Sequence, residues 1–260
     1  MEKKFTLLEN DTIQVEGRTL YRIQALKDFE IPIRNYIDEP DIGKYSVTKG
    51  QIGGYVEKEE NLSHEGGCWI LQNAKAYGNA LVKDNAHLYG WATISGDSVI
   101  GDYCQMSGRA VAKGQSTLLG CTQLNDQVIV NDSTVNGNIS LYGFTTVREK
   151  SELTRTVNLC GSVVVKGAKI IGPLYLNGPF NVSFDIKGEQ GIAAYRTTQP
   201  IEAGARKSED FATSTTQDIW ECDYFKGTGE ELLAFMEKIC PDSLGYYKNL
   251  VGYHKKQYNL

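Results

Sequence analysis

The residues best suited to acid–base chemistry in this chain are its three histidines, His64, His87 and His254. An imidazole can act as a general base near neutral pH. His254 lies among lysines near the C-terminus, where a solvated or helix-dipole role is expected, and His64 precedes the repeats described below. Only His87 is expected to point outward from a repeated strand. No carboxylate stands at a spacing that would orient it, so we favour a polar surface residue over a catalytic base.

The six cysteines form no metal-binding or redox motif. No pair has CxxC spacing, and no neighbouring histidine completes a zinc pattern. We therefore expect reduced thiols with packing roles, no metal and no cofactor. The glycines form no phosphate-binding loop, because they recur at a fixed period.

That period is six residues long, and it positions the candidate side chains. It runs from Asn73 through Asn138, and every sixth residue tolerates the positive φ of a corner. The corners are Gly78, Asp84, Gly90, Gly96, Asp102, Gly108, Gly114, Gly120, Asp126, Asp132 and Asn138. The residues two and four positions before each corner are aliphatic or small, and alternation along a strand turns both inward. Each hexad is therefore one short strand and one corner.

A fixed hexapeptide period is typical of a solenoid. The pattern resembles the left-handed parallel β-helix of hexapeptide-repeat proteins, in which residues eighteen apart align. At Gly143 the corner comes one residue early, and a weaker six-residue repeat continues from there to about Phe180. We expect a mainly β protein with a β-rich cap over residues 1–60 and a β-helix over 61–180. Roughly six coils at ~4.8 Å each would be about 29 Å long. A C-terminal α/β cap over 181–260 would end in two helices.

The flanks carry their own local signals. Strands around a Glu16–Gly17 turn predict a hairpin, whereas residues 30–50, with prolines and mixed charge, predict a loop. Short strand-like runs follow over 181–226. Thr228 is expected to cap a helix over 229–240, and a second helix is expected over 244–256.

The residue between the two inward positions faces out and falls into one of three columns. These columns are Leu81, Val99, Thr117 and Val135; Lys75, Thr93, Val111 and Ile129; and His87, Gln105, Gln123 and Leu141. The first two are too apolar for bare solvent, so we expect the C-terminal segment or another subunit to cover them. A trimeric or dimeric homo-oligomer would place Leu81, Val99, Val111, Ile129, Val135, Leu250 and Val251 at contacts. The third face is expected to be open and polar.

Composition narrows the function classes. The net charge of −5 argues against general nucleic-acid binding. No apolar run is long enough to span a membrane, and the start MEKKFTLLENDT lacks the apolar core of a signal peptide. We expect a cytoplasmic protein.

Two further segments carry a resemblance. Residues Gly53 to Ile70 and the pattern from Cys222 to Thr228 are similar to phage- and prophage-encoded hexapeptide β-helix proteins, often labelled transferases or polymer-forming cytoskeletal proteins. The resemblance implies a phage setting and the host cytoplasm. It favours a non-catalytic binding protein that inhibits host defence, either by binding a defence protein or by sequestering a nucleotide. An acyl-CoA-dependent acyltransferase using His87 comes second, and a structural scaffold third.

The candidate ligand contacts combine aromatic and basic groups, which suit a nucleotide. They are His87, Tyr89, Trp91, Tyr103, Arg109 and Lys113.

Overall fold

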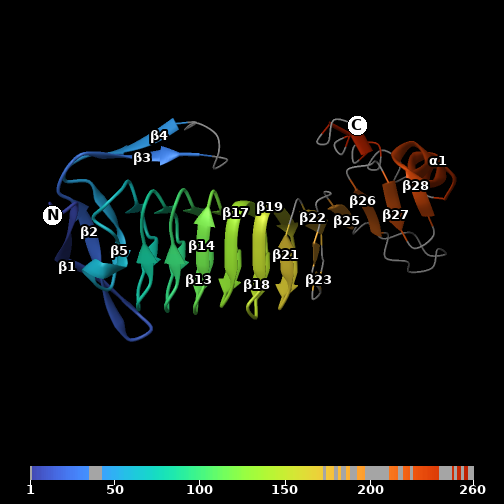
Figure 1. Cartoon of the computed structure of the whole chain (residues 1–260). Coiled ribbons are helices and arrows are strands. Elements are labelled where there is room, and N and C mark those ends of the chain that lie inside the picture. The colour runs from blue at the N-terminus through green and yellow to red at the C-terminus, as the bar shows by residue number, and fades with distance from the viewer. Residues whose placement is uncertain are drawn as a thin grey trace.

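The computed structural model describes residues 2–34, 43–171, 174–178, 181–182, 186–187, 192–196, 211–215, 219–222, 225–239, 248, 251–252 and 255–256. Figure 1 shows a stack of short strands with a β cap at the N-terminal end. The mainly β architecture and the parallel solenoid of about six coils confirm the predicted fold class. The left-handed sense of the winding stays a prediction, as do the domain boundaries.

The N-terminal cap begins with the predicted hairpin. β1 (Phe5–Val15) and β2 (Arg18–Ala25) pair antiparallel. The turn between them places Glu16 at φ 50° and Gly17 at φ 76°, the positive values that a two-residue hairpin turn requires. β5 (Ile52–Val56) pairs antiparallel with β2 and parallel with the first solenoid strand. The cap and the solenoid therefore share one continuous sheet.

The solenoid strands stack in three columns. The first holds β7 (Lys75–Ala76), β10 (Thr93–Ile94), β13 (Val111–Lys113), β16 (Ile129–Asn131), β18 (Thr146–Arg148) and β20 (Val164–Lys166). The second holds β8 (Leu81–Val82), β11 (Val99–Ile100) and β14 (Thr117–Gly120). The third holds β6 (Trp69–Ile70), β9 (His87–Leu88), β12 (Gln105–Met106) and β15 (Gln123–Leu124). From β6 to β13, each strand residue pairs with the one eighteen positions later, as predicted.

The register then shifts by one residue. Thr117 pairs with Thr134 and Gly120 with Gly137, so the coil that closes there is one residue short. The corner is Gly137, at φ 141°, instead of the predicted Asn138. The shift thus precedes Gly143, where the sequence placed it.

This shift corrects two predicted outward positions. Val135 and Leu141 are fully buried in the core, because the shortened coil turns both inward. Val135 is therefore not a subunit contact. Thr134 and Ser140 take the outward positions in the two columns.

Beyond the shift, the long strands β17 (Thr134–Leu141) and β19 (Glu152–Gly161) each contribute to two columns. β21 (Lys169–Ile171), β22 (Leu174–Gly178), β23 (Asn181–Val182), β24 (Ile186–Lys187) and β25 (Ile192–Arg196) continue the parallel stack. The inward residues of this weaker repeat, Val147, Leu153, Leu159 and Val165, are fully buried as predicted. The apolar interior therefore continues at least as far as Ile170, which is also fully buried.

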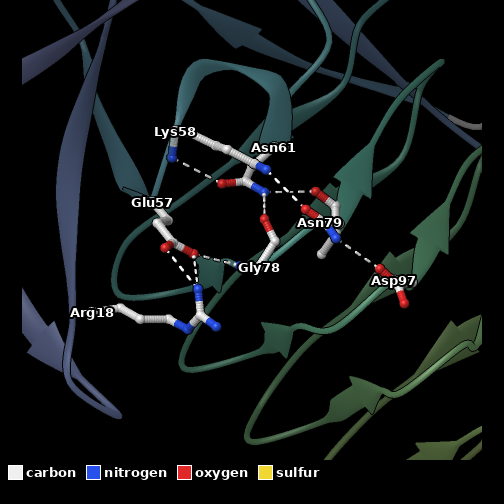
Figure 2. A network of polar contacts seen from close by, with 8 residues as sticks. Arg18, Glu57, Lys58, Asn61, Gly78, Asn79 and Asp97 are labelled. Carbon is white, nitrogen blue, oxygen red and sulfur yellow. Dashed lines mark hydrogen bonds and ion pairs between the residues drawn. The ribbon is translucent and has the colours of Figure 1, made fainter.

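A polar network joins the cap to the first coil (Figure 2). The Glu57 carboxylate accepts hydrogen bonds from Arg18 Nη1 at 2.8 Å and from the Gly78 N–H at 2.6 Å. Burial opposes ionisation of Glu57, but these two donors outweigh it and lower its pKa. Asn61 donates to the carbonyls of Gly78, at 3.1 Å, and Ala80, at 2.8 Å. The side chains of this network satisfy one another and the corner backbone, which indicates a structural role.

Lys4 holds the first strand against the pre-repeat segment. It is 1% exposed, and its Nζ donates to the carbonyls of Glu65, Gly66 and Cys68 and to Cys68 Sγ at 3.1 Å. His64 lies beside it, with Nδ1 accepting the Lys4 N–H at 3.1 Å. His64 also stacks on Phe5 with ring centroids 4.4 Å apart. These contacts give His64 a packing role within the cap.

The segment expected to be a loop contains a second hairpin. β3 (Phe29–Ile33) and β4 (Gly43–Val47) pair antiparallel, and Figure 1 shows them lying along the first coils. We call this hairpin the arm. Pro32 is compatible with β3 because both strands of a two-stranded ribbon are edges. The loop prediction over 30–50 is therefore wrong for these strands.

The C-terminal region ends in antiparallel strands and a helix. β26 (Phe211–Thr215), β27 (Ile219–Cys222) and β28 (Phe225–Thr228) precede α1 (Gly229–Ile239). The Thr228 cap is confirmed, because Glu231 N–H donates to Thr228 Oγ1 and Glu231 Oε2 accepts the Thr228 N–H. Across the described part of the chain, no helix combines the length and apolar character that crossing a bilayer demands.

The predicted second helix lies mostly outside the described residues. Within it, Lys248, Val251, Gly252, Lys255 and Lys256 are helical. Val251 is 3% exposed, so its own chain already buries this predicted subunit contact. Leu250 and His254 lie outside the described residues.

Candidate functional site

A cavity of about 430 Å³ lies between the arm and the third face of the solenoid. We call it the arm cavity. Its lining residues are Ile31, Ile33, Tyr45, Gln51, Ile52, Leu71, Gln72, His87, Tyr89 and Gln105. Because the solenoid interior is filled with buried side chains, a ligand site must lie outside it, and this cavity meets that condition.

Alternation along β3 explains how the arm forms one wall. Phe29, Ile31 and Ile33 share one side of the strand. Phe29 packs edge-on against Trp69 with centroids 5.3 Å apart, and Ile31 is fully buried. At the end of β3, the Arg34 carbonyl accepts a hydrogen bond from Gln105 Nε2 at 3.4 Å. The arm therefore covers the third face over its first coils, and the expectation of an open face is wrong there.

His87 is one of the residues that line the arm cavity. It follows the same alternation, with Leu88 turned into the core and both His87 and Tyr89 turned toward the arm. The two rings stack with centroids 6.1 Å apart and planes 20° apart. His87 is only 7% exposed. This burial places the imidazole where a bound molecule would meet it away from bulk water.

The environment of His87 keeps it uncharged near neutral pH. Burial lowers the pKa of His87, and the Asn85 backbone and the Gln105 side chain counter only part of that effect. Its Nδ1 is buried and has no hydrogen-bond partner among the described residues. Buried polar atoms are rarely left unpaired, so this nitrogen is a candidate hydrogen-bonding group for a water or a ligand beside the cavity.

The rim of the arm cavity is aromatic and aliphatic. Tyr45, Ile52 and Tyr89 are 42%, 45% and 36% exposed, in contrast to the buried His87. Gln51 Nε2 donates to the Tyr45 hydroxyl at 2.9 Å, which holds one side of the rim. The Gly90 N–H donates to Gln72 Oε1 at 2.8 Å, which orients the Gln72 amide at the other. The opening is therefore lined by side chains that other residues hold in place.

The structure brings together two of the six predicted ligand contacts, His87 and Tyr89. Tyr103 instead packs under Arg34, whose Cζ lies 4.2 Å from the ring centroid. Trp91 is 58% exposed at the corner after Gly90, and Arg109 follows at the stacked corner of the next coil.

Lys113 belongs to β13 and therefore to a different column. The predicted aromatic and basic cluster is thus divided among the cavity, a corner and another face.

Sequence reasoning missed the arm residues and Gln72, and it placed Gln105 on the third face without assigning it to the site. The alternation in FEIPI and GKYSV could have revealed β3 and β4. Nothing local could have shown which face the hairpin covers. Among the described residues, no group of His, Cys, Asp or Glu side chains could hold a metal ion.

Comparison with known proteins adds a partial match. No family model matches the chain. A stretch of 69 residues is 32% identical to "Uncharacterized acetyltransferase YdcK" from Escherichia coli strain K12. That stretch is 26% of this chain and 21% of YdcK, so the chain matches about a fifth of its relative's length. Together with the solenoid, this similarity fits the hexapeptide-repeat β-helix proteins.

Proposed function

We propose that the protein is a hexapeptide-repeat acyltransferase that uses His87 as its general base. One observation carries the proposal: a buried, uncharged imidazole with an unpaired Nδ1 lines a cavity large enough for a small molecule. The similarity to a protein named as an acetyltransferase supports the reaction class. We therefore favour the acyltransferase, ranked second from the sequence, over the non-catalytic binding protein that was ranked first.

The proposed reaction joins an acceptor in the arm cavity to the acyl group of acyl-CoA. Nδ1 takes the proton from the acceptor hydroxyl or amine as the acceptor atom attacks the thioester carbonyl. The carbon–sulfur bond then breaks, and the imidazolium returns the proton to the departing thiolate. The products are the acylated acceptor and CoA with a free thiol.

The test is release of CoA thiol from acetyl-CoA by the purified protein, with a mixture of small alcohols and amines as acceptors. His87→Gln should slow release by roughly 10²- to 10⁴-fold, the usual contribution of a general base. Gln123→Ala is the control, because Gln123 stands one coil beyond Gln105 in the same column and does not line the cavity. Equal rates for the wild-type protein and His87→Gln would reject the proposal.

Binding without turnover is the second candidate. Among the described lining residues there is no carboxylate to orient His87, and many general bases have such a partner. Native mass spectrometry of the protein purified from bacterial cells separates the two functions. A small molecule released unchanged on denaturation, with no thioester cleavage, would favour binding. Inhibition of a host defence protein, nucleotide sequestration and a scaffold role all stay predictions.

A further inference from the structure

We infer that the arm cavity takes an uncharged ligand with a hydroxyl group on a compact apolar body, so that the acyl acceptor is an alcohol. The role of this ligand as acyl acceptor rests on the proposed function. The ligand class itself follows from the lining alone. Three features of the described residues support it: the charges, the free hydrogen-bonding groups and the walls.

Among the described lining residues, no side chain is charged at neutral pH, given that burial lowers the pKa of His87. Arg22 reaches the cavity wall but is already occupied, because its Nη1 donates to the Gln72 carbonyl at 2.7 Å and its Nε pairs with Asp11 at 3.2 Å. Arg34 stacks over Tyr103. Moving a charged group out of water without a counter-charge is strongly unfavourable. The cavity therefore disfavours ammonium, carboxylate and phosphate groups.

The hydrogen-bonding groups left over in the cavity require both a donor and an acceptor. His87 Nδ1 has no partner among the described residues and can accept. Gln72 uses its Oε1 for the Gly90 N–H, which leaves its amide nitrogen to donate into the cavity. A hydroxyl both donates and accepts, whereas an ammonium only donates and a carboxylate only accepts. An alcohol can therefore satisfy both through a single oxygen atom.

The walls define the rest of the ligand. Ile31, Ile33, Ile52 and Leu71 present aliphatic surface, and Tyr45 adds an aromatic ring at the rim. Burying apolar area there stabilises a bound molecule by roughly 25 cal/mol per Å². A saturated ring or short branched chain next to the hydroxyl matches these walls.

Three probes of nearly equal size test the inference: cyclohexylmethanol, cyclohexylmethylamine and cyclohexanecarboxylate. Dissociation constants are measured at pH 7.5 by ligand-detected NMR on the full chain, without acetyl-CoA. The alcohol should bind at least tenfold more tightly than either charged probe. His87→Leu should weaken alcohol binding by at least fivefold, and Gln123→Ala should leave it unchanged. Equal or tighter binding of a charged probe, or no binding of the alcohol, would overturn the inference.

A second variant changes the charge without disturbing the core. Ile52 is 45% exposed at the rim, so Ile52→Glu should fold normally and add one carboxylate beside the cavity. It should tighten binding of the amine probe at least fivefold relative to wild type. An unchanged amine affinity in the folded variant would mean that the probes do not occupy this cavity, and the inference would fail.

The experiment also separates this inference from the proposed function. Alcohol selectivity without any cleavage of acetyl-CoA would retain the ligand class and remove acyl transfer. Acyl transfer to amines in preference to alcohols, dependent on His87, would support the proposed function and reject the alcohol.

Discussion

Lys4 and His87 are the buried basic side chains among the described residues, and burial lowers the pKa of both. They differ in their partners. Lys4 Nζ donates to three backbone carbonyls and one sulfur atom, whereas His87 Nδ1 has no partner among the described residues. A satisfied buried group indicates a structural role, whereas an unsatisfied one beside a cavity is a candidate to bind a water or a ligand. The two residues therefore lead to different predictions.

For His87, the prediction concerns pH. Because its folded-state pKa lies below the ordinary value of 6.5, the unfolded chain binds more protons just below that pH. Stability should therefore fall as pH drops from about 6.5 through the folded-state pKa. Urea unfolding at pH 7.5 and 5.5 should show a smaller loss for His87→Gln than for wild type. Identical losses would show that burial does not depress this pKa.

For Lys4, the prediction concerns stability. Lys4→Met leaves buried carbonyls without their donor, and we expect a loss of about 2–4 kcal/mol. Lys3→Met is the matched control, because Lys3 is exposed and pairs with Glu59 at the surface. The control should cost no more than ~1 kcal/mol. Chemical denaturation measures both, and equal losses would contradict the role assigned to Lys4.

At the scale of elements, the corner is the unit that makes this fold possible. Each corner residue adopts a positive φ, and non-glycine corners such as Asp84, Asp102 and Asp126 also do so, at φ 58°, 49° and 60°. Stacking brings successive corners into contact along the prism. A glycine is required most strongly where the next corner leaves no space for a Cβ atom.

Gly17 and Gly120 allow the cost of backbone strain at positive φ to be separated from the cost of a steric clash at the Cβ atom. Their φ values are 76° and 77°, but a Cβ on Gly17 would meet no atom within 4 Å, whereas one on Gly120 would lie 2.6 Å from the Gly137 carbonyl oxygen. Gly17→Ala should cost roughly 1–2 kcal/mol from backbone strain alone. Gly120→Ala should cost about 1–3 kcal/mol more because of the clash. Thermal unfolding tests this, and equal costs would show that stacked corners can separate without penalty.

At the scale of the whole molecule, two faces of the solenoid remain to be explained. Leu81, Val99 and Val111 are half-buried in the single chain, and Ile129 is 37% exposed. An apolar column on an exterior face favours contact with a second copy. We therefore keep the homo-oligomer as a prediction, with these four residues at its contacts.

The oligomer is tested by sedimentation velocity. Ile129→Lys should shift the wild-type assembly toward monomer, because a buried lysine without a counter-charge destabilises an interface. Gln123→Lys, on the column that faces away from these contacts, should leave the assembly unchanged. A monomeric wild-type protein would contradict the prediction.

The elements whose signals are local could be predicted from the residues alone. The hexad period specifies strand, corner and inward position because each depends on only a few neighbouring residues, and the β1–β2 turn and the Thr228 cap are local for the same reason. The one-residue shift was misplaced because Gly137 and Asn138 are adjacent and both suit a corner. The sequence also singled out His87 as the histidine on a coil.

The surroundings of His87, in contrast, depend on contacts between segments that are distant in the sequence. The arm cavity joins Ile31, Tyr45 and Ile52 to His87 and Gln105, residues that lie far apart along the chain. Alternation predicts which side of the β3–β4 hairpin is apolar, but not which solenoid face it covers, because that choice depends on long-range packing such as Phe29 against Trp69. Burial, the lowered pKa and the unpaired Nδ1 of His87 all follow from that docking, so no local pattern could reveal the site.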